Sequence, residues 1–196
     1  MRTLNIIVIF FALSLSLQAK ILKGEVSFTS FGEAEKVAHL TWIVESTKVG
    51  LFSSDVYGYV LNYRYSTEYD EENKILRNME ISFPIKAMNS DNESRDEKLH
   101  TICMGLPTHE NIVVKIAGPL FLKDKRARAY TGVVTIRGKE KPFTISMTAN
   151  ETSKFIGLKG EAKWSLKKME IPDPSIAVAK LSDEIRINLS LEVPLN

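Results

Sequence analysis

Cysteines, histidines and glycine motifs are scarce in this chain, and each shortage excludes a class of site. The single cysteine, Cys103, excludes an intramolecular disulfide and a zinc site built from several cysteines. The three histidines, His39, His100 and His109, lack the His-x-His or H-E-x-x-H spacing typical of bound metal. The sequence also has no P-loop, no G-x-G-x-x-G turn and no G-x-S-x-G nucleophile elbow. We therefore expect a protein that is not an enzyme, with no metal site, no cofactor and no catalytic residues.

An excess of one charge is also missing. The chain has 26 Lys and Arg residues against 24 Asp and Glu residues, which gives a formal net charge of +2. Proteins that bind nucleic acids usually carry a clear basic excess, so we expect no nucleic acid partner. With 196 residues, 44% hydrophobic and 26% charged, the composition is that of one ordinary globular domain.

Long hydrophobic runs are absent except at the N-terminus. There Arg2 precedes the segment 6–17, which is apolar apart from two serines, and Ala19 follows. A positive residue, a short apolar run and a small residue in this order are typical of a secretory signal peptide. We expect removal of residues 1–19, which leaves a periplasmic or secreted domain of residues 20–196 with no integral membrane span. An uncleaved N-terminal anchor is the alternative, although the run is short for a transmembrane helix.

Strict alternation of apolar and polar residues is the strongest pattern that is present. It is clearest near the C-terminus, at positions 185–195, and it recurs at 57–65 and 143–149. A period of two predicts half-buried β-strands, and many such strands must hide a shared apolar face. They do so by packing two sheets or by closing a barrel, so we expect an all-β fold. A barrel with an apolar interior can hold an apolar ligand.

One segment, 94–106, has helical spacing instead. Ser94 and Glu97 match a capping box at its start, and Pro107 ends it. Its apolar residues fall on one helical face: Leu99, Ile102, Cys103 and Leu106. A thiol on such a face is buried and inert, so we expect an unreactive Cys103 rather than a nucleophile paired with histidine.

Three stretches, in matching order and spacing, resemble the YceI-like family of secreted lipid- and polyisoprenoid-binding proteins. The first is MNSDNESRD at 88–96, the second is TGVVTIRG at 131–138 followed by KPF at 141–143, and the third is IPDPS at 171–175 followed by SDEI at 182–185. The resemblance implies an extended eight-stranded antiparallel β-barrel, similar to a lipocalin, with one short helix. It also implies a long apolar cavity that takes an isoprenoid, a fatty acid or a related chain without reaction.

The inward face of such a barrel would form the ligand site. We expect the tunnel to be lined by aromatic and apolar residues from several strands: Phe28, Trp42, Tyr57, Tyr59, Leu61, Tyr63 and Phe83. Aromatic residues also fill ordinary cores, so the tyrosine stripe at 57–65 has that second interpretation. Arg95 either meets a polar head group of the ligand or forms a structural pair with Asp96.

Three functions compete at this point. The leading hypothesis is a periplasmic carrier or sequestering protein for long-chain isoprenoid or fatty-acid-like lipids. The alternative is an envelope structural or stress-response protein whose barrel is filled by its own side chains. A lipid hydrolase or isomerase would need a polar cluster facing the cavity, which the sequence does not supply. Whether the barrel is a monomer or a homodimer is left open.

Overall fold

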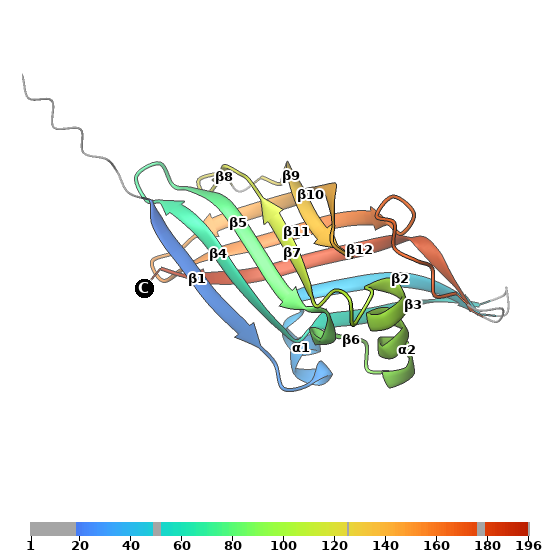
Figure 1. Ribbon diagram of the computed structural model, residues 1–196. Coiled ribbons are helices and arrows are strands. Elements are labelled where there is room, and N and C mark those ends of the chain that lie inside the picture. Colours follow the sequence, from blue (N-terminus) through green and yellow to red (C-terminus); the bar gives the residue numbers. More distant parts are fainter. Residues whose placement is uncertain (1–18, 49–51, 125, 176–178, 196) are drawn as a thin grey trace, which may run out of the picture.

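The protein folds as one antiparallel β-sheet that curls into a half-barrel, with two short α-helices beside it (Figure 1). This computed structural model describes residues 19–48, 52–124, 126–175 and 179–195. The expected signal peptide, residues 1–19, lies outside these ranges except for Ala19. The all-β expectation is confirmed.

Twelve strands make up the described sheet, rather than the expected eight. They are β1 (Lys20–Ser27), β2 (Leu40–Lys48), β3 (Phe52–Val60), β4 (Asn62–Asp70), β5 (Ile75–Pro84), β6 (Met88–Asn89), β7 (Asn111–Ile116), β8 (Leu120–Phe121), β9 (Arg128–Ile136), β10 (Lys139–Glu151), β11 (Phe155–Ser165) and β12 (Ala179–Pro194). Their order in space is β1-β4-β5-β7-β9-β10-β11-β12-β2-β3-β6, and β8 pairs with β5. The higher count arises because two strands have only two residues and because one long run bends into β3 and β4.

The bend between β3 and β4 falls at Leu61 and reverses which residues face inward. In β3 the inner positions are even, as the buried Gly58 and Val60 show, whereas in β4 they are odd, as the buried Tyr63 and Tyr65 show. Backbone hydrogen bonds hold the bend: the Leu61 amide donates to Ala87 O at 2.8 Å, and the Phe28 amide donates to Leu61 O at 2.7 Å. The continuous alternation predicted over 57–65 is therefore wrong, because a one-residue irregularity exchanges the two faces.

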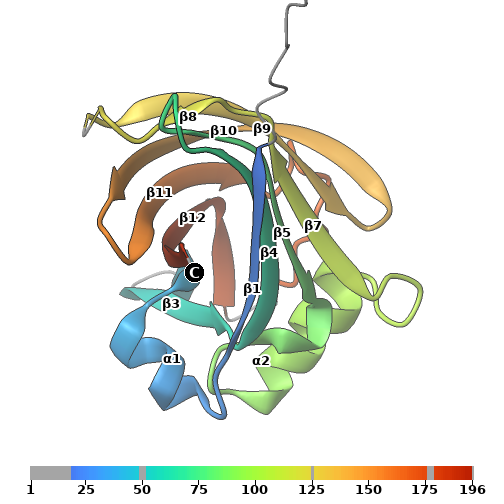
Figure 2. The same cartoon turned by 90° about the vertical axis from the view of Figure 1, so that its left-hand side faces the viewer.

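Helix α1 (Phe31–Val37) covers part of the outer face of the sheet at β3. Its Ser30 cap accepts a hydrogen bond from the Glu33 amide, and Phe31 packs edge-on against Tyr59 with ring centroids 4.9 Å apart. The helix was not expected, because only seven residues are helical and their apolar side chains do not recur at helical intervals. Figure 2, which views the curled sheet from one end, shows α1 and α2 on the same side of it.

Helix α2 (Glu93–Lys98) continues into a π-helical turn, Leu99–Cys103. The helix confirms the position of the expected 94–106 segment, but its N-cap is Asn92 rather than Ser94, because the Asn92 side chain accepts from the Arg95 amide at 3.0 Å. The π turn widens the helix by one residue and rotates Ile102 toward solvent, where it is 45% exposed. Cys103 stays buried, as expected.

The half of the barrel near the β4–β5 hairpin is filled by side chains. Tyr69, Leu76 and Met79 are almost fully buried there. A polar network joins this hairpin to the end of β10: the Tyr69 hydroxyl donates to Glu151 Oε1 at 2.5 Å, and Lys74 Nζ contacts the same oxygen at 2.9 Å. Burial raises the pKa of Glu151, but these hydrogen bonds from Tyr69 and Lys74 outweigh burial and leave its pKa below the usual 4.5.

The network of Tyr69, Lys74 and Glu151 should contribute to the free energy of unfolding. We expect Glu151→Ala to lower the free energy of unfolding by about 2 kcal/mol, because Tyr69 and Lys74 lose their shared acceptor in a partly buried place. Since the folded pKa of Glu151 is lowered, its contribution is complete above the unfolded pKa of 4.5 and is lost as the pH falls through the folded value. Urea unfolding at about pH 7 and about pH 3 measures both effects. The control is Glu161→Ala, an exposed glutamate of β11; equal losses in the two variants at neutral pH would contradict the prediction.

Candidate functional site

A cavity of about 480 Å³ occupies the other half of the barrel. Its wall is mostly apolar and comes from nine neighbouring strands, β5, β7, β9, β10, β11, β12, β2, β3 and β6, with contributions from α2, the π turn and the segment before β12. Representative wall residues are Val44 on β2, Phe83 on β5, Val114 on β7, Ile145 on β10 and Ile187 on β12. The volume lies within the roughly 300–1,000 Å³ typical of small-molecule sites. The arrangement can therefore enclose an apolar ligand.

Pairs of glycine and aromatic residues on neighbouring strands keep this space open. Trp42 on β2 lies opposite Gly58 on β3, and a Cβ built on Gly58 would come within 2.1 Å of the indole ring. Phe143 on β10 lies opposite Gly132 on β9, where an added Cβ would come within 2.6 Å of the phenyl ring. Each ring thus lies flat over the bare backbone of its neighbour instead of extending into the barrel. The glycines make room for the aromatic wall, and the aromatic wall leaves room for a ligand.

Polar and charged residues line one end of the cavity, which we call the mouth. They come from strands β2 and β3, from α2 and its N-cap, and from the segment before β12: Ser46, Lys48, Ser54, Asp55, Asn92, Ser94, Arg95, Lys98 and Ser175. The carboxylate of Asp55 is paired with Arg186 at 2.6 Å. Among the residues with described positions, no carboxylate forms an ion pair with Lys48, Arg95 or Lys98. The mouth therefore carries a positive surplus.

Arg95 lies at the mouth and does not pair directly with Asp96. Its Nε donates to Ser90 Oγ at 2.7 Å and its Nη2 to the Ser90 carbonyl at 2.8 Å. The buried Asp96 accepts from the Ser90 amide at 3.0 Å, so Ser90 links the arginine and the aspartate without direct contact between them. Arg95 still lines the mouth, with its guanidinium held in place by Ser90.

The structure brings three of the eight expected site residues to the cavity. Trp42, Phe83 and Arg95 line it. The other five do not: Phe28, Tyr57, Tyr59, Leu61 and Tyr63. Their assignment to the tunnel wall is corrected here.

The bend at Leu61 explains why the tyrosines of β3 lie away from the cavity. It turns Tyr57 and Tyr59 to the outer face, where Tyr57 is 48% exposed and Tyr59 packs under α1. Tyr63 does face inward, but it is packed in the core without bordering the cavity, and its hydroxyl lies 3.4 Å from His39 Nδ1. Burial, and to a lesser extent Tyr65, raises the pKa of Tyr63, so it remains a neutral core residue. Phe28 lies edge-on to the His39 ring, away from the cavity.

Several wall residues were missed although the sequence carries their signal. Ile185, Ile187 and Leu189 belong to the alternating run of β12, and Phe143 and Ile145 belong to that of β10. Alternation identified their strands and inner faces. It does not distinguish inner residues that border a space from those that fill one, because both are apolar.

Cys103 lies in the cavity wall and is only 3% exposed. Burial, aided by nearby Asp173 and opposed by Arg137, raises the pKa of its thiol to about 11. A thiol with such a pKa is almost entirely protonated at neutral pH and is a poor nucleophile. The geometry gives it a packing role in the wall.

We expect native Cys103 to react with a disulfide reagent at least about 100-fold more slowly than in the unfolded chain, because both burial and the raised pKa suppress the thiolate. Absorbance of the released thiolate measures the rate, with and without denaturant. Since Cys103 faces the cavity, an added long-chain lipid should slow the native reaction further. Native labelling as fast as that of the unfolded chain would contradict this placement.

Within 19–48, 52–124, 126–175 and 179–195, no group of three or more His, Cys, Asp or Glu side chains is placed to hold a metal ion. Over the same ranges, no helix has the length and apolarity needed to cross a membrane.

Solved structures with the same fold include proteins of three species. A YceI protein of Campylobacter jejuni superposes with a TM-score of 0.64 at 19% identity, covering 76% of this chain and 94% of that one. BcnA of Burkholderia cenocepacia gives a TM-score of 0.61 at 11% identity, with 77% and 95% covered. A polyisoprenoid-binding domain of Saccharophagus degradans, implicated in plant cell wall breakdown, gives 0.60 at 7% identity, with 79% and 93% covered.

No curated protein sequence matches the chain, but a family model does. The model of the YceI-like domain matches residues 24–193, which extend from within β1 to the penultimate residue of β12 and include every residue of the cavity wall. The chain therefore belongs to the YceI-like family.

Proposed function

We propose that this protein binds a long-chain isoprenoid or fatty-acid-like lipid in its cavity and carries or sequesters it without chemical change. The observation that carries the proposal is the apolar cavity of about 480 Å³ with a polar mouth. A barrel that served only as a structural element would gain stability by filling this space, because empty volume costs packing energy. The polyisoprenoid-binding description of a structural neighbour supports the ligand class.

The size of the cavity sets the length of chain that it can enclose. If a chain carbon occupies about the same volume as a water molecule, roughly 30 Å³, the cavity holds about 16 of them. Burial of each is worth about 0.8 kcal/mol, and association costs about 4–15 kcal/mol. Chains of one or two isoprene units would therefore bind weakly, and chains of three or four units would bind usefully. The polar end of a longer ligand would remain at the mouth.

The N-terminal segment supports a location outside the cytoplasm. Because residues 1–19 have the features of a signal peptide, we propose that the domain acts in the periplasm or is secreted. The intact mass of the exported protein should then match a chain that starts at Lys20. Recovery of the uncleaved chain from the membrane fraction would overturn this part of the proposal.

Tryptophan fluorescence tests the ligand class directly, because both tryptophans, Trp42 and Trp164, line the cavity. Titration of delipidated protein with saturated and isoprenoid chains of increasing length should give affinity that rises with length and levels off near about 16 carbons. Affinity that is independent of chain length, or no saturable change with any chain, would reject the proposal.

A further inference from the structure

We propose that two buried methionines, Met79 and Met147, close the inner end of the cavity and set the longest chain that the protein can enclose. The proposal rests on the lipid-binding function and adds its specificity. A chain of about 16 carbons fills the site, and the further carbons of a long polyisoprenoid stay outside it. The proposal is carried by the place at which the cavity stops along three strands.

The cavity ends part-way along three strands of the curled sheet. The last wall residues on these strands are Ile81 on β5, Ile145 on β10 and Leu189 on β12. Two positions further from the mouth, the same inner faces carry Met79, Met147 and Leu191, and none of these three lines the cavity. Each of them is only 2% exposed. The three side chains therefore form the layer at which the cavity stops, and we call this layer the floor.

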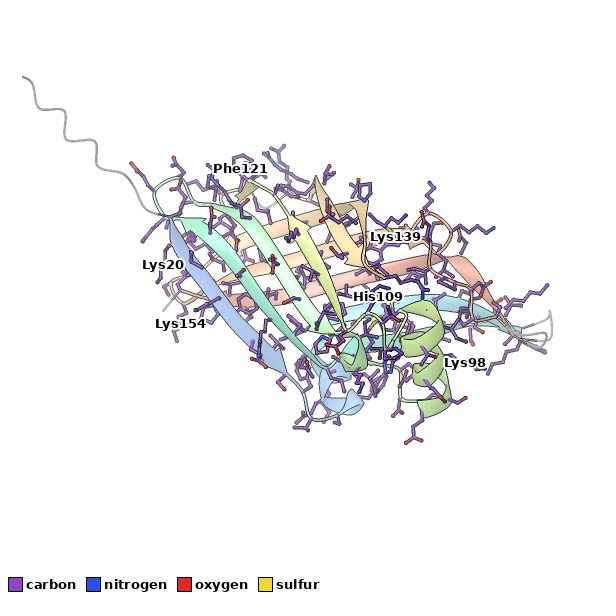
Figure 3. All side chains as sticks on the ribbon, in the orientation of Figure 1. Lys20, Lys98, His109, Phe121, Lys139 and Lys154 are labelled. Carbon is purple, nitrogen blue, oxygen red and sulfur yellow. The ribbon has the colours of Figure 1, made fainter. Side chains whose placement is uncertain are left out.

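The barrel continues beyond the floor. Strands β10 and β12 carry further buried residues on their inner faces past it, Ala149 and Val193. In Figure 3, Lys98 marks the mouth, and Lys154, in the turn between β10 and β11, lies toward the opposite end of the barrel. The cavity thus stops at side chains inside the barrel and not at the end of the barrel. Smaller side chains in the floor would therefore lengthen it.

Gly160 of β11 shows where the boundary between cavity and floor runs. It pairs with Met147 on β10 and, on its other side, with Leu189 on β12. A Cβ built on Gly160 would come within 2.9 Å of Ile145 Cδ1 and 3.5 Å of Met147 Cγ. The last wall residue and the floor residue of β10 therefore lie over the same bare stretch of backbone. Because Gly160 contributes no side chain, Met147 forms the floor at this point.

Methionine suits a floor that must close against chains of slightly different length. Its side chain is unbranched and flexible and carries a polarizable thioether, so it fills irregular apolar gaps. The end of a lipid chain is a methyl group, which can pack against such a side chain without leaving a polar atom unpaired. We therefore expect the methyl end of the ligand at Met79 and Met147 and its polar end at the mouth, beside Arg95 and Lys98.

Truncation of the floor should lengthen the chain that the protein accepts. Met147→Ala removes Cγ, Sδ and Cε, which leaves room for about two or three chain carbons. Affinity should level off near about 16 carbons in the wild type, near about 18 in Met147→Ala and near about 21 when Met79→Ala is added. Relative to a chain of about 16 carbons, one of about 20 should gain at least about tenfold in affinity in the double variant. Tryptophan fluorescence titration with unbranched fatty acids of about 12–24 carbons measures the plateau.

Two matched controls separate the floor from general effects of truncation. Met147→Leu conserves the volume of the side chain and should keep the plateau of the wild type. Met169→Ala makes the same truncation at a buried methionine that does not line the cavity and is not part of the floor, so it should also keep that plateau. Far-ultraviolet dichroism checks that each variant folds. Equal shifts in Met147→Ala and Met169→Ala, or an unmoved plateau in the folded double variant, would overturn the proposal.

A measurement on the wild type locates the chain end without any substitution. The methionine methyl groups are labelled with carbon-13, and the probe is a fatty acid of about 12 carbons with a nitroxide on its terminal carbon, which leaves room for the label. The nitroxide should broaden the signals of Met79 and Met147 most. Met88 and Met104 line the cavity on the segments that flank α2 and serve as the comparison. Stronger broadening at either of them would show that the chain end does not lie at the floor.

The same titrations separate failure of the floor from failure of the proposed function. If the wild type binds chains and the plateau is the same in every folded variant, the methionines do not set the chain length, and the lipid-binding function stands. If neither the wild type nor any variant binds a chain of any length, the lipid-binding function itself is rejected. A plateau that moves only when Met79 or Met147 is shortened supports both.

Discussion

Gly58→Ala is expected to weaken binding of a long-chain lipid about 100-fold. The added methyl group would come within 2.1 Å of Cε2 and Cζ2 of Trp42, so the indole must leave the surface of β3. The buried indole Nε1 makes no hydrogen bond to a described atom, so packing alone holds the ring in place. The free space beside it is the cavity, and an indole there would displace roughly four chain carbons at about 0.8 kcal/mol each. Fluorescence titration measures the loss.

Two further variants separate this effect from general damage. Gly32→Ala, in α1, meets no atom within 4 Å and should leave affinity unchanged. Trp42→Leu in the Gly58→Ala background should restore part of the affinity, because the smaller side chain tolerates the new methyl group; Trp164 remains as the reporter. If Gly58→Ala binds lipid as well as the wild type and folds normally, then the glycine does not keep the cavity open.

A charged side chain in the cavity wall should weaken lipid binding to a similar extent. Ile187 lies on the inner face of β12, opposite Trp42 on β2 and Ala162 on β11. Ile187→Glu would place a carboxylate against the lipid chain, where an unpaired charge costs several kcal/mol or takes up a proton instead. We expect affinity for an uncharged isoprenoid to fall at least about 100-fold at neutral pH and to recover partly below about pH 5, where the carboxylate is protonated.

The control for this charge lies on the same strand. Ser190 faces the other side of β12 and pairs with Lys159, so Ser190→Glu adds the same charge outside the cavity. It should bind lipid like the wild type at every pH. Equal binding by folded Ile187→Glu and Ser190→Glu would show that the ligand does not occupy the space beside Ile187.

Alternation predicted the strands well but failed at the bend. The β12 residues from Ile185 to Val193 have the facing that the pattern predicts, because a long paired strand keeps a strict period of two. Over 57–65 the same pattern continues through Leu61 while the backbone does not. The hydrogen bonds that fix the bend come from Ala87 and Phe28, which are distant in sequence. The alternation of residues within one segment does not reveal hydrogen-bond partners that are distant in sequence.

The existence of a cavity was implied by family resemblance, and its position required coordinates. Trp42 and Phe83 were identified because large aromatic residues fell on inward faces, whereas Tyr63 satisfied the same rule and is packed in the core without bordering the cavity. The difference depends on how side chains from many strands share volume. Gly58 and Gly132 are informative in retrospect, since each lies directly opposite an aromatic residue, but only the strand register makes that visible.

Native mass spectrometry of the protein purified without detergent from its own cells tests the central claim most directly. The account predicts a population heavier than the mature chain by the mass of one long-chain lipid, and loss of that population in Ile187→Glu but not in Ser190→Glu. A wild-type spectrum that contains only the bare chain, and that stays bare after incubation with isoprenoid and fatty-acid chains of about 16 carbons, would contradict it.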